Sequence, residues 1–216
     1  MCRLLGLVSV APMRPHSIFK AFAKACQSNN EFQGDGWGLA WSDGGNWTVF
    51  RELNPIWETD FVLPEKVTGL LVHARSAFEN YDVALPYNMP FSREGFHFIF
   101  NGELHGVRIP VKGISGAEKI FNLARKLHRG CWNDTLKRLS EILQKRSQRV
   151  KAANMILADG ARLVGLTRFD CDPDYFSLWR HRQTGLDMVC SEKLATVSSW
   201  SSIPNGWTFQ LGGSPW

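Results

Sequence analysis

Short apolar runs that end at glycine, proline or asparagine constrain the fold of this chain more than any other feature of its sequence. The runs that predict strands are 2–10, 34–41, 47–51, 67–74, 96–100, 153–158, 163–167, 175–179 and 188–190. The segments with helical spacing are fewer: 18–29, 117–128 and one that is capped by Asn133 or Asp134 and continues to 143. Because strands and helices do not alternate one to one, the pattern favours a layered α+β domain.

The length of 216 residues suits one domain, which we take as residues 1–216, with a substantial buried core. Hydrophobic residues make up 44% and charged residues 21%, which argues against a disordered or fibrous chain. No apolar run approaches the ~18 residues that cross a bilayer. The apolar stretch 4–13 is a poor signal peptide. We therefore expect no membrane association and a cytoplasmic location.

The five cysteines are odd in number and scattered, and no two of them form a C-x-x-C pair. A disulfide framework or a zinc site is therefore disfavoured, and we expect a reduced protein with no metal and no cofactor. The net charge of +5 is weak support for nucleic-acid binding. The densest basic cluster, at 145–151, follows a helical pattern and is expected to be a solvated helix end.

Cys2 follows the initiator methionine directly. If Met1 is removed, the thiol of Cys2 and a free α-amine lie on one residue. An α-amine has a pKa of ~7.7–8 and a thiol one of ~8.5, so the amine can act as the base that activates the thiol. The alternative is a small apolar residue buried at the edge of the first strand. Myristoylation is disfavoured because it requires glycine in this place.

Two further features come directly after predicted buried strands. Asn101-Gly102 can supply an amide side chain and a backbone N–H to a tetrahedral oxyanion, although the same pair is most often a turn. Arg75, in H-A-R-S-A-F, offers a planar fork for a carboxylate. For an isolated Arg, a structural ion pair is the alternative.

Taken together, five short motifs span most of the chain. They are M-C-R-L-L-G at 1–6, D-G-W-G-L-A-W at 35–41, H-A-R-S-A at 73–77, F-N-G-E-L at 100–104 and C-S-E-K-L at 190–194. In this order and spacing they resemble class II glutamine amidotransferase domains, which are N-terminal nucleophile hydrolases. The D-G-W-G form resembles the small stand-alone branch that includes γ-glutamyl amidohydrolases. The resemblance implies a four-layer αββα sandwich, with two antiparallel sheets between helical layers.

The resemblance also implies roles for individual residues. Cys2 matches the nucleophile, and its freed amine matches the base. Asn101 and Gly102 match the oxyanion hole. Arg75 matches the residue that binds the α-carboxylate of the substrate, and Ser76 and Ala77 continue the same substrate-binding segment.

Three positions depart from the pattern of the family. Phe100 stands where His is usual, Phe78 stands where Thr is usual, and Gly116 stands where an Asp normally holds the α-ammonium group of the substrate. The loss of that charge-assisted hydrogen bond would weaken binding about tenfold to a hundredfold. Glu118 and Asp35 are the carboxylates that could replace it, and we include Asp35 among the expected substrate-binding residues.

The leading hypothesis is therefore an enzyme that hydrolyses a γ-glutamyl amide through a thioester on Cys2. Ammonia or an amine would leave, and ammonia could pass to a separate synthase or partner subunit. A non-catalytic or regulatory subunit that retains the fold is the alternative; Gly116 and Phe78 favour it, whereas Cys2 and Arg75 oppose it. Nucleic-acid binding is the least supported reading.

Overall fold

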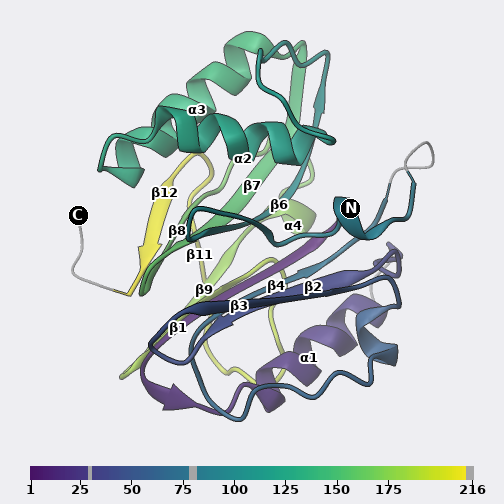
Figure 1. Cartoon of the computed structure of the whole chain (residues 1–216), viewed down its shortest axis with the longest axis vertical. Helices are drawn as coiled ribbons and strands as arrows, with labels where there is room; N and C mark the ends of the chain where they lie inside the picture. The colour runs from purple at the N-terminus through teal and green to yellow at the C-terminus, as the bar shows by residue number, and fades with distance from the viewer. Residues whose placement is uncertain (29–30, 78–81, 213–216) are drawn as a thin grey trace.

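Two antiparallel sheets lie face to face at the centre of the structure, and helices cover both outer sides (Figure 1). The computed structural model describes residues 1–28, 31–77 and 82–212. Helix α1 (His16–Gln27) packs on the outer face of one sheet, whereas α2 (Gly116–Leu127) and α3 (Trp132–Arg146) cover the other. This arrangement confirms the expected four-layer αββα sandwich.

The sheet beneath α1 has seven strands in the described part of the chain, in the order β11-β9-β10-β1-β4-β2-β3. Their bounds, in chain order, are β1 Arg3–Met13, β2 Trp37–Ser42, β3 Trp47–Glu52, β4 Val67–Ala74, β9 Trp179–Gln183, β10 Leu186–Cys190 and β11 Ser201–Ser202. The first strand lies near the middle of the sheet, between β10 and β4. Its first five residues, 3–7, are buried, which explains the apolar sequence at the start of the strand, whereas its last residues are more exposed.

The sheet beneath α2 and α3 has five described strands in the order β12-β8-β7-β6-β5. Their bounds are β5 Phe91–Arg93, β6 Phe96–His105, β7 Arg149–Asp159, β8 Arg162–Leu166 and β12 Thr208–Leu211. A four-residue helix α4 (Pro173–Phe176) and two 3-10 turns (Ile56–Glu58 and Leu85–Tyr87) complete the described elements. Because β5 pairs only with the first residues of β6, the second half of β6 has one unpaired edge.

The apolar core has two parts, one on each side of the seven-stranded sheet. Leu70 and Val72 of β4 belong to the cluster packed against α1, whereas Leu71 belongs to the cluster between the sheets. The alternation follows from the two-residue period of a strand. Each fully buried Leu contributes about 1.5–3 kcal/mol through removal of apolar surface from water. The two clusters fix the sheets in place and hold the strand ends that carry the site.

The strand predicted at 96–100 does not end at Asn101-Gly102. Strand β6 continues to His105, because β7 pairs with it along its whole length, including the pairs Asn101–Asn154 and Gly102–Ala153. The strand end predicted at this pair is therefore wrong, and the alternative in which the pair forms a turn does not hold. Both residues lie inside a strand, which gives them a fixed backbone direction.

The strand predicted at 175–179 is also wrong. Asp172 has a positive φ of 53° and Pro173 occupies the first helical position, so this part of the chain begins the short helix α4. Strand β9 begins only at Trp179. The helical turn places Tyr175 near the start of the chain, where its hydroxyl group donates to the carbonyl oxygen of Met1.

The third helix begins earlier than predicted. Its N-terminal cap is Cys131, and neither Asn133 nor Asp134 caps it, because the buried Trp132 starts the helix and donates to Asp159 across 2.8 Å. The basic cluster at 145–151 is divided between two elements: α3 ends at Arg146, and residues 149–151 belong to β7. Asn29, the predicted end of the first helix, lies outside the described residues.

Candidate active site

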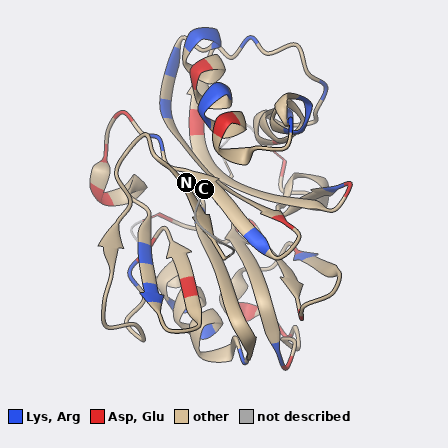
Figure 2. Ribbon diagram, turned by 90° about the vertical axis from the view of Figure 1, so that its left-hand side faces the viewer, with Lys and Arg blue, Asp and Glu red and all other residues tan. Residues whose placement is uncertain are grey.

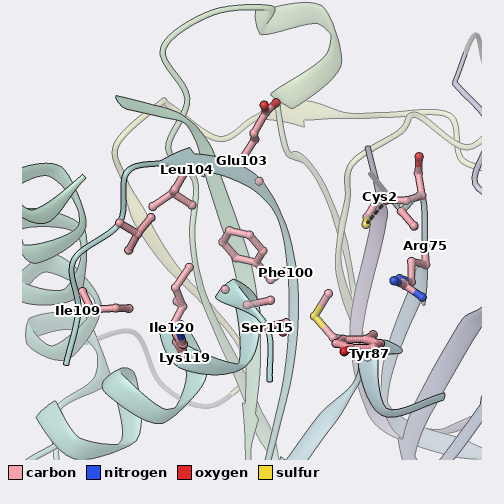
Figure 3. Close-up of a pocket in the computed structure, with 17 residues that line it drawn as sticks. Cys2, Arg75, Tyr87, Phe100, Glu103, Leu104, Ile109, Ser115, Lys119 and Ile120 are labelled. Atoms are coloured by element: carbon pink, nitrogen blue, oxygen red, sulfur yellow. Dashed lines mark hydrogen bonds between the residues drawn. The ribbon is translucent and has the colours of Figure 1, made fainter. Parts of the chain in front are cut away.

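Cys2 and Arg75 meet where β1 and β4 end side by side. The register of the two strands places Arg3 opposite Ala74, so residue 2 lies beside residue 75. The Sγ atom of Cys2 lies 3.7 Å from the carbonyl oxygen of Ser76 (Figure 3). The antiparallel pairing thus brings the predicted nucleophile and the predicted carboxylate-binding residue to one edge of the sheet.

The thiol of Cys2 needs a base before it can act as a nucleophile. Burial raises the pKa of Cys2, and the hydrogen bond to Ser76 and the positive charges of the chain terminus and Arg75 oppose the shift. A thiol with a raised pKa is protonated near neutral pH. Because the net effect is a raised pKa, the surroundings of Cys2 alone do not convert its thiol to the thiolate.

Met1 occupies the place from which a free Cys2 amine would emerge. Its α-ammonium group pairs with Glu31, and its carbonyl oxygen accepts hydrogen bonds from the Tyr175 hydroxyl at 2.7 Å and from Gln33 Nε2 at 3.3 Å. Gln33 is fully buried, and its Oε1 atom has no hydrogen-bond partner among the described residues. Two polar side chains are therefore already directed at the peptide bond between Met1 and Cys2.

The guanidinium group of Arg75 is buried and lacks a described carboxylate partner. Arg75 is 6% exposed, and it donates to Asn88 Oδ1 at 3.3 Å and to the carbonyl oxygen of Asp82 at 2.9 Å. Its Cζ atom lies 5.7 Å from the ring centroid of Tyr87. A buried charge without a counter-ion is costly, so this arrangement favours an anionic ligand.

Asn101 carries a buried side chain with no described hydrogen-bond partner. It is 0% exposed, and neither its Nδ2 nor its Oδ1 atom is bonded. Ile99 lies two positions before Asn101 in β6, and its partner on β7 is Ile156. The side chain of Ile156 faces Gly6 of β1, so this face of the five-stranded sheet is turned toward the other sheet. By the two-residue period, Asn101 also faces the sheet that carries Cys2. An unsatisfied amide in this position costs about 1–3 kcal/mol, which a ligand would recover.

The backbone N–H of Gly102 points out of the unpaired edge of β6. Ala153 is the partner of Gly102 on β7. The N–H of Ala153 donates to the carbonyl oxygen of Arg168 at 2.7 Å, on the side of β7 that faces away from β6. The two residues therefore form a non-hydrogen-bonded pair, in which both N–H groups point away from the partner strand. A Cβ at position 102 would lie 2.2 Å from the carbonyl oxygen of Ala152, so glycine is required here.

His73 ties the two sheets together between these groups. Its Nε2 atom donates to the carbonyl oxygen of Phe100 at 3.2 Å, which links β4 to β6. Burial, together with the nearby charge of Arg75, lowers the pKa of His73 to about 3. The ring is therefore neutral near pH 7, and it positions the strand that carries Asn101 against the strand that leads to Arg75.

A cavity of about 370 Å³ opens between these groups and α2, a size typical of small-molecule sites. Of the residues predicted from the sequence, Cys2, Arg75, Ser76, Ala77 and Gly102 line this cavity. Asn101 lies one residue from two lining residues but is not itself a lining residue. The structure thus brings together most of the predicted site.

The two carboxylates considered as replacements for the missing one, Asp35 and Glu118, are not among the residues that line the cavity. Asp35 does not line the cavity; its carboxylate accepts a hydrogen bond from the Ala77 N–H at 2.7 Å. Glu118 pairs with Arg93 and accepts from the Ile114 N–H at 2.7 Å, so it stabilises the start of α2. Neither carboxylate replaces the one that is missing at Gly116, which does line the cavity. The role of Asp35 as a substrate-binding residue stays a prediction, and Phe78 lies outside the described residues.

The far end of the cavity is apolar, a feature that no sequence motif indicated. Leu104, Ile109 and Ile120 lie across the cavity from Cys2 and Arg75, with Phe100 between the two groups (Figure 3). Lys119 lies beside Ile120. These side chains come from β6, from α2 and from the loop between them, so only the tertiary fold places them together.

The described residues contain no group of three or more His, Cys, Asp or Glu side chains that could hold a metal ion. No described helix is long and apolar enough to cross a membrane. Lys and Arg positions are interspersed with Asp and Glu positions over both halves of the molecule (Figure 2).

The fold and the family comparison agree on the class of this protein. The four-layer arrangement is the fold of the N-terminal nucleophile hydrolases of the amidotransferase type. The family model of the class-II glutamine amidotransferases matches residues 1–184, and the chain belongs to this family. Family membership supports hydrolysis or transfer of the glutamine amide as its general chemistry. No curated protein matches the sequence.

Solved structures of related proteins share the fold at low sequence identity. The glutamine phosphoribosylpyrophosphate amidotransferase of B. subtilis has a TM-score of 0.69 and 15% identity, over 97% of this chain and 47% of that one. A predicted glutamine amidotransferase of Pseudomonas aeruginosa has a TM-score of 0.63 and 18% identity, over 97% and 96%. A glutamine aminotransferase class-II domain protein of Silicibacter pomeroyi has a TM-score of 0.63 and 17% identity, over 98% and 95%. This chain therefore spans about half of the first relative and nearly all of the other two.

Proposed function

We propose that this chain is an amide hydrolase that cleaves a γ-glutamyl-type amide through a thioester on Cys2, after removal of Met1. The observation that carries the proposal is the convergence of three groups. The thiol of Cys2 and the buried guanidinium of Arg75, which has no described carboxylate partner, line one cavity, and the unpartnered amide of Asn101 lies between two residues that line it. The Arg75 charge without a described counter-ion and the Asn101 amide without a described partner are costly in the empty site. Each would gain a partner from a substrate that carries a carboxylate and an amide carbonyl.

In the first half of the reaction, the Cys2 thiol gives its proton to the α-amine of the same residue. The sulfur attacks the amide carbon, and the carbonyl oxygen becomes an oxyanion. The Asn101 side-chain N–H and the Gly102 backbone N–H donate to that oxyanion, which is the largest expected contribution to catalysis. The ammonium group then protonates the leaving nitrogen as the carbon–nitrogen bond breaks, which releases ammonia or an amine and leaves a thioester.

In the second half, a water molecule gives a proton to the α-amine and attacks the thioester carbon. The same two donors hold the second oxyanion. The carbon–sulfur bond then breaks, the thiol regains its proton, and the product leaves as a carboxylic acid. We propose that Tyr175 and Gln33, which now hold the Met1 carbonyl, hold the freed amine through both halves. A reducing compartment such as the cytoplasm keeps Cys2 in the thiol form that this reaction requires.

The proposal is tested with two preparations of the chain, one with Met1 retained and one with Met1 removed, each verified by intact mass. We expect amide hydrolysis only in the processed form, because a peptide nitrogen cannot accept the thiol proton. The Cys2→Ala variant of the processed form should lose about 10⁴-fold or more in kcat, as expected when a nucleophile is removed. Equal activity in the Cys2→Ala variant would refute the mechanism. Cys26→Ala, which removes a buried thiol on the α1 side of the sheet, is the matched control.

A second candidate is the supply of ammonia to a separate synthase. The observation in its favour is that this chain matches only 47% of the phosphoribosylpyrophosphate amidotransferase of B. subtilis. We distinguish the two by measuring release of the amine or ammonia from the isolated chain. Steady turnover without any acceptor protein supports the hydrolase, whereas turnover that depends on an added partner supports the second candidate.

A further inference from the structure

The charges around the cavity are unfavourable for a substrate with a free α-ammonium group. The described lining residues include three charged side chains, and only one of them, Glu103, is acidic. Both of its oxygens are occupied: one is 2.9 Å from His105 Nε2 and the other is 3.3 Å from Lys151 Nζ. Figure 3 shows the Glu103 carboxylate directed away from Ser115 and Tyr87. No described carboxylate that lines the cavity is therefore available to an ammonium group.

The two remaining charged groups repel a cation. Arg75 is buried, and the ammonium group of Lys119 forms no ion pair with a described residue. A substrate ammonium would lose its water shell without gaining a lining carboxylate that is not already paired, which is unfavourable in a site of low polarity. An uncharged nitrogen, such as that of an amide, avoids this cost.

The wall opposite Cys2 is suited to an apolar substituent. Leu104, Ile109 and Ile120 form it together with Phe100 (Figure 3). Val107, which lies in the chain between Leu104 and Ile109, also lines the cavity. Burial of each CH₂ group of a ligand against such a wall contributes about 0.8 kcal/mol. Lys119, at the same end, can donate a hydrogen bond to a carbonyl oxygen.

We infer that, if the amide hydrolysis proposed above is correct, the substrate is an N-acylated glutamine-type amide. Arg75 binds its carboxylate, Cys2 attacks its side-chain amide, and its acyl group lies against Leu104, Ile109 and Ile120. Lys119 donates to the acyl carbonyl. The α-nitrogen is an uncharged amide and needs no carboxylate partner.

The test compares kcat/KM for four compounds: glutamine, N-acetylglutamine, N-hexanoylglutamine and γ-glutamyl hexylamide. The last compound has a free α-amine and carries its hexyl chain on the side-chain amide. We expect the N-hexanoyl compound to exceed glutamine by tenfold or more, because several CH₂ groups are buried and an unpaired ammonium is avoided. Equal or faster cleavage of glutamine would overturn the inference. Preference for the free-amine hexylamide would also overturn it, since the apolar wall would then bind the leaving group.

A gain-of-function variant gives a second, independent test. Gly116→Asp adds a carboxylate where an added Cβ meets no heavy atom within 4 Å, and an acidic residue at the first position of α2 favours the helix. We expect it to shift the kcat/KM ratio toward glutamine by about tenfold to a hundredfold. Gly116→Asn has nearly the same shape without the charge and should leave the ratio unchanged. An unchanged ratio in Gly116→Asp would contradict the inference.

Failure of the inference and failure of the proposed function give different results. If glutamine is cleaved better than the acylated compounds, only the inference is wrong. If no compound is cleaved and Cys2 does not react with an electrophilic amide analogue, the proposed function is wrong as well.

Discussion

The two ends of the cavity are built in opposite ways. The nucleophile end consists of polar groups: the Cys2 thiol, the buried Arg75 guanidinium without a described carboxylate partner, and the buried Asn101 amide without a described hydrogen bond. The distal end, at Leu104, Ile109 and Ile120, consists of apolar side chains with the ammonium group of Lys119 beside them.

The contrast separates chemistry from recognition. Groups that are costly in the empty site are arranged for one reaction, because each must meet a particular atom of the substrate. The distal wall limits the size and polarity of the substituent that can bind there, and it takes no part in the reaction. Substitutions of Cys2 and Asn101 should therefore slow every substrate alike, and substitution of Arg75 should weaken every substrate that carries the carboxylate. Substitutions at the distal end should change only the preference among those substrates.

After Cys2→Ala, Asn101→Ala should have the largest effect at these two ends. The loss of one oxyanion donor lowers kcat by about 10²–10³-fold. Because the donor contacts the reacting carbonyl, the loss should be the same for glutamine and for acylated substrates, measured by steady-state kinetics. Asn154→Ala, on the neighbouring strand, is the control for damage to the β6–β7 pairing. A loss confined to one substrate would contradict the assignment.

Arg75→Gln should raise KM by about tenfold to a hundredfold, because a charged hydrogen bond to the substrate carboxylate is worth roughly 1.5–3 kcal/mol. The effect should vanish for a substrate in which that carboxylate is replaced by a carboxamide. Arg93→Gln, which removes a cation that pairs with Glu118 outside the cavity, is the comparison. An equal loss on both substrates would mean that Arg75 acts only on the fold.

His73 should make the folded state less stable as the pH falls below 6.5. The unfolded chain binds a proton near the ordinary pKa of 6.5, whereas the folded chain does so only near a pKa of about 3. The unfolded state thus binds more protons between these values, so stability decreases by about 1.4 kcal/mol per pH unit and by about 2 kcal/mol at pH 5. Urea unfolding as a function of pH measures the slope.

His73→Gln retains a donor for the Phe100 carbonyl and should flatten this slope. His97, whose pKa burial lowers to about 4, contributes to the same range in both proteins. If the variant does not fold, NMR titration of the unmodified chain decides the question. Titration of His73 near pH 6.5 in the folded protein would contradict its neutral, buried role.

Val107→Ser should have the smallest effect, and it tests most directly whether the two ends of the cavity act separately. Val107 lines the distal end but is 38% exposed, so its replacement should leave folding intact. The loss of about two methyl groups of contact should lower kcat/KM for the N-hexanoyl substrate several-fold. Glutamine hydrolysis should be unchanged. A parallel loss on glutamine would show that the two ends are not separable.

The sequence predicted much of the nucleophile end because its residues are marked locally. Cys2 is distinguished by its place after Met1, and Arg75 and Gly102 lie in short motifs that follow strand-like apolar runs. The structure brings all three to one cavity. The Asn-Gly pair misled only about the backbone, because its usual turn preference is overridden by the pairing of β6 with β7.

The remaining features depend on contacts between distant parts of the chain. Tyr175 bonds to Met1 across 174 positions, and the apolar pattern at 175–179, which predicts a strand, does not reveal the helical turn that begins at Pro173. The link from His73 to Phe100 joins two sheets. The apolar wall combines residues from β6, a loop and α2. No local pattern encodes such juxtapositions, which follow from sheet order and register.

Labelling with a diazo-ketone analogue of glutamine, in its free-amine and N-acetylated forms, tests the assignment of the nucleophile most directly. The chain with Met1 removed is treated with each reagent, digested and mapped by mass spectrometry. We predict modification of Cys2 alone, faster with the N-acetylated reagent and abolished in the form that retains Met1. Modification at Cys26, Cys131, Cys171 or Cys190 with Cys2 unmodified would contradict the assignment of Cys2 as the nucleophile.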